Sequence, residues 1–221
     1  NGLINGIDAS QTSIEPANYS LAGTLFRENT AQLDANFMTA WETHFILAEA
    51  AEKGFSDKTK TWKLKAENVR DFGFATSRKF IWDMQAVKLG NRDVMAVSMY
   101  PKEGNPLWEE YSTKAVAHTL KSYSSHTFDY PYPKAISVHA KRQGMEYPMI
   151  CWNYGRPNKD GSYSDRTKYG MISVIIHEVG HNFFPMIVNS DERQWGWMDE
   201  GLDTFMQYMA EQEFGEAYPE A

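Results

Sequence analysis

The sequence predicts an α+β fold, in which strands come first and two helices follow. Short segments with alternating apolar and polar residues, typical of half-buried strands, recur between residues 61 and 154. Two longer segments with helical spacing come after them, Met171–Phe184 and Met198–Phe214. Strands grouped before helices favour an α+β architecture over a regular alternation of strand and helix. Hydrophobic residues make up 42% of the chain and aromatic residues 14%, enough to build a packed core.

The pattern changes near residue 60, and we expect a domain boundary there. Residues 1–60 are an N-terminal polar and helical segment whose role the sequence does not indicate. Within it, residues 31–53 have helix-forming composition with Gly54 as the stop, although Thr43–Leu47 also fits a short strand. Residues 61–221 are expected to form the second domain.

Strand patterns in this second domain are short and separated by turn-forming residues. The last of them leads into a polar loop, Gly155–Lys168, that contains an Asn-Lys-Asp-Gly turn signal. The expected strands are Thr61–Lys65, Phe74–Trp82, Val94–Met99, Ala135–His139 and Pro148–Tyr154.

Three segments of the second domain have helical spacing. Trp108–Ser124 is amphipathic and must end before the prolines at Pro131 and Pro133. Met171–Phe184 is apolar on most sides, as in a central buried helix, and Pro185 is expected to stop it. Met198–Phe214 carries one apolar face, and the Met and Trp residues near its start are expected in the core.

Charge and hydropathy exclude two classes of partner. The chain has 22 basic and 29 acidic residues, a formal net charge of -7, so no nucleic-acid partner is expected. Its apolar runs are far shorter than the roughly 18 residues that a membrane span requires, so no transmembrane segment is expected.

The residues that carry chemistry are His177-Glu178-Val179-Gly180-His181, an HExxH motif. Residues four apart on a helix share one face, so both imidazoles can direct a nitrogen at one ion about 2.0–2.1 Å away, the usual Zn–N distance. Zinc lowers the pKa of its bound water from about 15.7 toward about 7. Glu178, next to the first histidine, is then expected to act as general base.

A catalytic zinc ion needs a third protein ligand as well as an open position for water. Glu200 lies nineteen positions after His181, at the start of the next helix, within Gly-Trp-Met-Asp-Glu-Gly-Leu. Two antiparallel helices joined by a loop could bring it against the HExxH helix. We expect one Zn²⁺ per chain, held by His177, His181 and Glu200.

The HExxH motif followed after eighteen residues by a Glu in a W-x-(N/D)-E-G context resembles the aminopeptidase N family of zinc peptidases, which are gluzincins. The resemblance covers roughly Thr61 to Glu213. It implies a thermolysin-like catalytic domain over residues 61–221: a small mixed sheet packed on helices, with the HExxH helix central. It also implies that Pro148–Tyr154 is the edge strand along which a peptide substrate lies.

The family also has a G-x-M-E-N segment about thirty residues before the zinc helix, and Gly144-Met145-Glu146-Tyr147 is similar to it. One residue is missing between Gly144 and Met145, and Tyr147 replaces the Asn. The resemblance implies that Gly144, Met145 and Glu146 bind substrate, with the Glu146 carboxylate on the free amino terminus of a peptide.

Zinc-bound histidines usually donate their second ring N–H to a carboxylate or carbonyl group. Asp199 and Asp203 are the nearest carboxylates in sequence, and Asn182 is another polar neighbour. Asp199 directly precedes the expected glutamate ligand, a position with this task in thermolysin-like sites, so we expect it to orient His181.

The family places an oxyanion-stabilising tyrosine some sixty residues beyond the glutamate ligand. Twenty-one residues follow Glu200 here, and neither Tyr208 nor Tyr218 matches that position. We therefore expect the chain to be a fragment or a short relative. The resemblance also favours a periplasmic or secreted, cell-surface location.

Three functions remain open on the sequence. The first is an aminopeptidase, which Glu146 favours. The second is a zinc endopeptidase of thermolysin type, in which Glu146 has another role. The third is a non-enzymatic peptide-binding domain that lacks the catalytic tyrosine. Cleavage of peptides with free and blocked N-termini separates the first two, and the presence of Glu178 argues against the third.

Overall fold

The structure, a computed structural model, describes residues 45–49, 60–142, 144–215 and 218–219. The chain divides into two units, Asn1–Arg70 and Asp71–Ala221. In the described part of the first unit, β1 (Phe45–Glu49) pairs antiparallel with β2 (Lys60–Leu64).

The structure confirms the sequence expectation for β2 and contradicts the one for β1. β2 matches the strand expected at Thr61–Lys65. The helix expected over residues 31–53 is wrong at Phe45–Glu49, where the short-strand alternative holds because the segment pairs with β2. The remainder of that segment lies outside the described residues.

The second unit is built on a mixed sheet with the strand order β3-β4-β5-β7-β6. β4 pairs parallel with β5 and β5 with β7, whereas β3 and β6 pair antiparallel at the two edges. The strands are β3 (Phe80–Leu89), β4 (Arg92–Pro101), β5 (Lys134–His139), β6 (Met145–Tyr147) and β7 (Ile150–Asn153). A mixed α+β fold is therefore confirmed.

The first edge strand starts later than its sequence pattern predicts. The strand expected at Phe74–Trp82 begins at Phe80 and runs on to Leu89. A two-residue turn at Gly90-Asn91 ends it, with Gly90 at φ +53, the left-handed conformation that such hairpin turns require. Half of the residues of β3 are exposed and few are buried, which weakens the apolar alternation from which a strand is predicted.

At the opposite edge of the sheet, the edge strand is not the one expected from the sequence. Pro148–Tyr154 does not provide the edge strand, since β7 lies between β5 and β6. A tight turn at Pro148-Met149, with Met149 at φ +66, folds the chain back so that β6 covers the outer side of β7. The open edge is therefore the strand that carries Met145 and Glu146.

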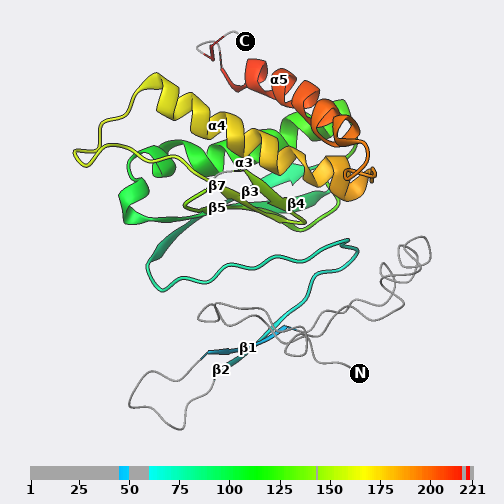
Figure 1. The fold of residues 1–221 in the computed structure, drawn as a ribbon, viewed down its shortest axis with the longest axis horizontal. Helices are drawn as coiled ribbons and strands as arrows, with labels where there is room; N and C mark the ends of the chain where they lie inside the picture. Colours follow the sequence, from blue (N-terminus) through cyan, green and yellow to red (C-terminus); the bar gives the residue numbers. More distant parts are fainter. Residues whose placement is uncertain (1–44, 50–59, 143, 216–217, 220–221) are drawn as a thin grey trace. The chain divides into compact units, whose positions relative to one another are not determined.

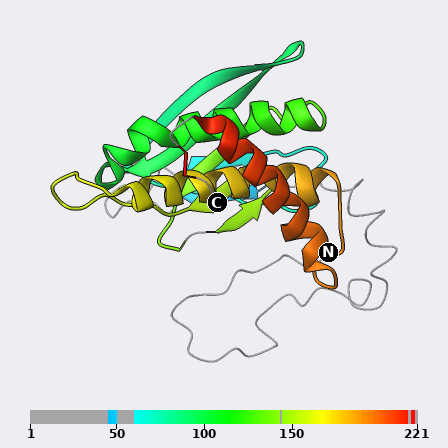
Figure 2. The same cartoon turned by 90° about the horizontal axis from the view of Figure 1, so that it is seen from above.

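Helices α3 and α4 pack on one face of the sheet (Figure 1). α3 (Leu107–His126) contacts β3, β4 and β5, and α4 (Asp165–Gly180) contacts β5, β6 and β7. The fully buried side chains between these layers include Trp108, Leu120, Ile172 and Ile176. α5 (Leu202–Phe214) crosses α4 and also contacts α3 (Figure 2).

The HExxH helix begins earlier and ends earlier than expected. Ser164 caps its N-terminus by accepting a hydrogen bond from the Thr167 N–H, at 3.2 Å. The α-helix stops at Gly180, and a wider π-helical turn, η3 (Asn182–Ile187), continues the chain. Phe184 within it is extended, at φ -137 and ψ 110, because the residue before a proline avoids the helical conformation.

The second C-terminal helix also opens with a π-helical turn, η4 (Trp197–Gly201), which carries Glu200. The Met and Trp residues of this region are not in the core of the described structure: Trp195 is 52% exposed, Trp197 69% and Met198 42%. A short 3-10 helix, η2 (Lys102–Gly104), links β4 to α3. Among the helices that the structure describes, none combines the length and the apolar character needed to cross a membrane.

Candidate metal centre and active site

The two histidines of the HExxH motif face each other at the C-terminal end of α4. Their Nε2 atoms lie 3.0 Å apart. His181 is 1% exposed and the side chain of His177 is 19% exposed. Two imidazole nitrogens at this distance either share a proton or share a cation.

Glu200 brings a carboxylate oxygen to the same point from η4. Its Oε2 atom lies 3.1 Å from His177 Nε2 and 3.7 Å from His181 Nε2. Ligand atoms about 2.0–2.1 Å from a tetrahedral zinc ion stand about 3.3 Å from one another. The three separations of 3.0, 3.1 and 3.7 Å surround that value, so the donor set and its spacing fit zinc.

The other ring nitrogen of His177 is held by α5. His177 Nδ1 lies 3.0 Å from Asp203 Oδ2 and 2.9 Å from Gln207 Oε1. Asp203 is among the partners expected from the sequence, whereas Gln207 is not. Gln207 stands four residues after Asp203 and thus on the same face of α5, so helical spacing alone could have indicated it.

The other ring nitrogen of His181 has a backbone partner. Nδ1 donates to the Phe184 carbonyl oxygen at 2.9 Å, whereas Asp199 Oδ1 lies at 3.3 Å. Asp199 is thus beside His181, as expected, but Phe184 is its nearer partner. This carbonyl is not among the partners expected from the sequence, because it reaches the ring only where the backbone leaves the helix before Pro185.

Asn182 bonds to neither imidazole. Its side-chain oxygen accepts from the Met149 N–H at 2.7 Å, and its amide donates to the Val179 carbonyl at 3.1 Å. These bonds tie the end of α4 to the turn between β6 and β7. In the structure Asn182 therefore fixes the helix against the sheet instead of orienting a ring.

Glu178 is buried beside the two histidines. It is 4% exposed, and its Oε2 atom has no hydrogen-bond partner among the described residues. Burial raises the pKa of Glu178 to about 7, although the two imidazoles act in the opposite direction. A buried carboxylate oxygen without a partner is costly, and a bound water or cation would relieve it.

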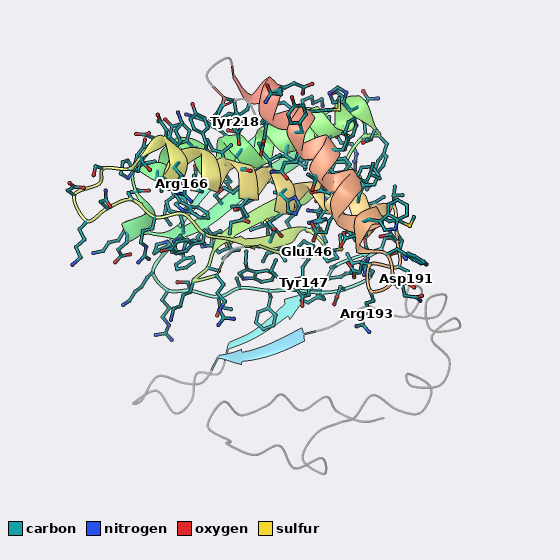
Figure 3. All side chains as sticks on the ribbon, turned by 45° about the horizontal axis from the view of Figure 1, so that its top comes forward. Glu146, Tyr147, Arg166, Asp191, Arg193 and Tyr218 are labelled. Atoms are coloured by element: carbon teal, nitrogen blue, oxygen red, sulfur yellow. The ribbon has the colours of Figure 1, made fainter. Side chains whose placement is uncertain are left out.

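Glu146 also reaches the site. Its carboxylate, a ring nitrogen of His181 and a carboxylate oxygen of Asp199 lie within 4.8 Å of one another. Figure 3 shows Glu146 on its strand below the adjoining ends of the two C-terminal helices.

The two neighbours of Glu146 in the sequence motif are placed differently. Gly144 has φ +81, and a Cβ there would stand 3.3 Å from Glu178 Oε1, so this glycine borders the Glu178 carboxylate. Met145 is 45% exposed and pairs with Trp152 on the other face of the sheet. The structure thus brings Gly144 and Glu146 to the histidines and turns Met145 away.

Carboxylates dominate the electrostatics of the site. Burial, together with the carboxylates of Glu192, Glu200 and Glu146, raises the pKa of Asp199 to about 6 against the opposing effect of His181. Burial disfavours the charged form of His177, but Asp203 outweighs it and raises the pKa of His177 to about 9. A crowded set of acidic groups that hold imidazoles in their charged form is the environment that a divalent cation stabilises.

A second way of grouping these ligands uses Asp203 instead of Glu200. One ligand atom from each of His177, His181 and Asp203 lies within 4.8 Å of the others. Asp203, however, stands on the Nδ1 side of His177, away from the point at which the two Nε2 atoms meet. Its position suits an orienting residue, and Glu200 is the better third ligand.

Tyr218 lies away from this centre. Its ring packs edge-on against Tyr169, near the N-terminal end of α4, with ring centroids 5.0 Å apart. In Figure 3 it stands at the opposite end of α5 from Glu146. Tyr218 therefore does not serve as the oxyanion-stabilising tyrosine of this site.

No protein-family model and no curated protein matches the sequence. Among solved structures, the chain is similar to aminopeptidase A of Legionella pneumophila in complex with aspartic acid, at 13% identity, over 61% of this chain and 16% of that chain, with a TM-score of 0.52. An M1 zinc metallopeptidase from Deinococcus radiodurans aligns over 62% of this chain and 29% of that chain, at 17% identity and a TM-score of 0.44. The chain thus spans less than a third of the length of these structures. The likeness to the Legionella enzyme is one of fold: about three fifths of this chain folds as part of that aminopeptidase does.

Proposed function

We propose that this protein is a zinc metallopeptidase of the aminopeptidase N type, with a thermolysin-like catalytic domain, that removes residues from the N-termini of peptides. One observation carries the proposal: two imidazole nitrogens and the Glu200 carboxylate meet at zinc-like spacing beside a buried, unpartnered Glu178. The fold shared with an aminopeptidase supports it.

His177, His181 and Glu200 are the proposed ligands of one Zn²⁺. Asp203 and Gln207 hold the Nδ1 side of His177, and the Phe184 carbonyl holds that of His181, so both rings turn Nε2 toward the place where the metal would replace the Nε2 protons. A zinc ion bound there supplies a water of lowered pKa and polarises the scissile carbonyl group.

Glu178 moves the proton in this proposal. A carboxylate whose pKa is about 7 accepts a proton from the attacking water near neutral pH and can return it to the leaving amine. Its Oε2 atom, unpaired within the described residues, is the acceptor available for that task.

Glu146 makes the site selective for the N-terminal end of a peptide. A partly buried carboxylate attracts an ammonium group, and the free N-terminus of a peptide supplies one. Because β6 is the edge of the sheet, a peptide can pair with its outer side while its first residue reaches Glu146.

The test uses one peptide in two forms, with a free and with an acetylated N-terminus, incubated with zinc-loaded protein and read by mass spectrometry. Stepwise loss of N-terminal residues from the free peptide alone is the expected result. Internal cleavage of both forms would make the protein an endopeptidase and remove the role given to Glu146. Binding of both forms without cleavage would leave a peptide-binding domain.

A further inference from the structure

A buried tyrosine on α3 reaches the residue that holds His177. The Tyr123 hydroxyl lies 3.1 Å from Asp203 Oδ1 and 3.1 Å from the Asp203 carbonyl oxygen. Tyr123 is fully buried, and its ring packs against Phe183, with centroids 5.3 Å apart. The hydroxyl has one proton to donate, and both acceptors belong to Asp203.

Gly180, the glycine of the HExxH motif, makes this contact possible. A Cβ at Gly180 would stand 2.3 Å from Asp203 Oδ1 and 2.4 Å from the Tyr123 hydroxyl oxygen. Real side chains do not approach so closely, so any larger residue at this position must displace one of the two. The Tyr123–Asp203 pair thus occupies space on α4 that only glycine leaves open.

Asp203 needs both of its partners. Its side chain is 0% exposed, and a buried carboxylate is costly unless hydrogen bonds or opposite charge compensate it. His177 Nδ1 lies at an ion-pair distance of 3.0 Å from Oδ2, which has no hydrogen bond among the described residues, whereas the Tyr123 hydroxyl donates to Oδ1. With one oxygen held from α3, the other stays directed at the imidazole.

We propose that Tyr123 is a positioning residue of the zinc site, whose hydroxyl fixes the Asp203 carboxylate and, through it, the His177 ring with Nε2 toward the metal. The inference rests on the proposed zinc site and adds a third helix to it. Partners of zinc-bound histidines contribute about 10- to 100-fold to metal affinity, and a group one step further out contributes less.

Tyr123→Phe removes the hydroxyl and keeps the ring. We expect zinc affinity, measured by competition with a chromogenic chelator at a temperature at which all variants are folded, to fall about 3- to 10-fold. Tyr130→Phe is the matched control: Tyr130 is equally buried, packs on the same Phe183 at 5.3 Å, and donates to the Lys134 carbonyl. That control should bind zinc as tightly as the unmodified protein.

A double-mutant cycle separates positioning from general stability. Asp203→Asn keeps the shape of the side chain and should weaken zinc binding about 10- to 100-fold. In that background, Tyr123→Phe should add little, because the hydroxyl acts through Asp203. The visible spectrum of Co²⁺-loaded protein should change in Tyr123→Phe and stay the same in Tyr130→Phe.

Three results would overturn the inference. The first is a zinc affinity of Tyr123→Phe equal to that of Tyr130→Phe, and the second is an equal loss with and without Asp203→Asn. The third is an Asp203→Asn variant that binds zinc like the unmodified protein, a result that decides the matter even if Tyr123→Phe does not fold. Absence of zinc binding in the unmodified protein would instead contradict the proposed function.

Discussion

Glu146 stands opposite Cys151 where β6 pairs with β7, so the two side chains share the face of the sheet that α4 covers. Cys151 is 1% exposed beneath the helix, whereas Glu146, on the edge strand, is only partly buried. A carboxylate therefore stands beside the proposed metal centre at the β6 edge of the sheet, where an extended peptide could join it.

Glu146→Gln should weaken the selection of free N-termini. A charge-assisted hydrogen bond contributes about 1.5–3 kcal/mol, so we expect kcat/KM for a peptide with a free N-terminus to fall about 10- to 100-fold. Zinc content should not change. Met145→Leu, on the opposite face of the same strand, is the control and should keep its activity; an equal loss in both variants would argue against an amine site at Glu146.

Glu178→Gln should separate metal binding from turnover. The amide keeps the size of the side chain but cannot accept the proton, so the rate should fall by about 10²–10⁴ while zinc remains bound. Metal content by mass spectrometry and peptide turnover are measured on the same sample. Retention of more than a few per cent of the activity would mean that another group is the base.

Glu200→Ala should lower zinc affinity, because it removes the proposed third ligand from a set of three. We expect a decrease on the order of 100-fold or more, beyond that seen for outer partners of a zinc site. Glu213→Ala, which removes a carboxylate that binds Ser122 and His126 on α3, is the control on the adjoining helix α5. Unchanged metal occupancy in Glu200→Ala would place the third ligand elsewhere, with Asp203 as the first alternative.

His139 should make stability depend on pH away from the metal site. It is 7% exposed, its Nε2 atom has no hydrogen-bond partner among the described residues, and its ring packs on Trp108 and Tyr154. Burial, with Arg156 nearby, lowers the pKa of His139 from 6.5 to about 4.

The sign of this effect follows from proton binding. Between pH 4 and 6.5 the unfolded chain binds more protons at His139 than the folded protein does, so the free energy of unfolding falls as the pH drops through this window. The loss is at most about 3 kcal/mol. Denaturant unfolding of zinc-free protein should show it, and His139→Gln should flatten the dependence; an equally steep curve in the variant would assign the effect to other groups.

The order of the strands and helices from Val94 onward could be predicted because periodicity and turn residues are local signals. The three-residue strand β6 could not, since so short a segment has no periodicity of its own. Without β6, the sequence predicts that Pro148–Tyr154 is the edge strand, whereas β6 lies outside β7. The exposed Trp195 and Trp197 show a related limit, because composition does not tell which apolar residues stay at the surface.

The proposed ligands could be read from HExxH and the spacing of Glu200, since both follow from helix geometry. Their supporting contacts depend on tertiary structure. Phe184 acts through its carbonyl group, which no side-chain pattern reveals, and Tyr123 comes from a helix fifty-four positions before His177. The sequence indicates this tyrosine only indirectly: Gly180, within the motif itself, has no side chain and so leaves room for the Tyr123 hydroxyl.

Native mass spectrometry of the protein purified with zinc, beside His181→Ala, measures whether the chain binds one zinc ion through this histidine. His181 is the most buried of the three proposed ligands, so its loss leaves no substitute at that position. We expect one zinc ion per chain in the unmodified protein and none in the variant under the same conditions. A folded, unmodified protein that carries no zinc, or a variant that retains a full equivalent, would contradict this expectation.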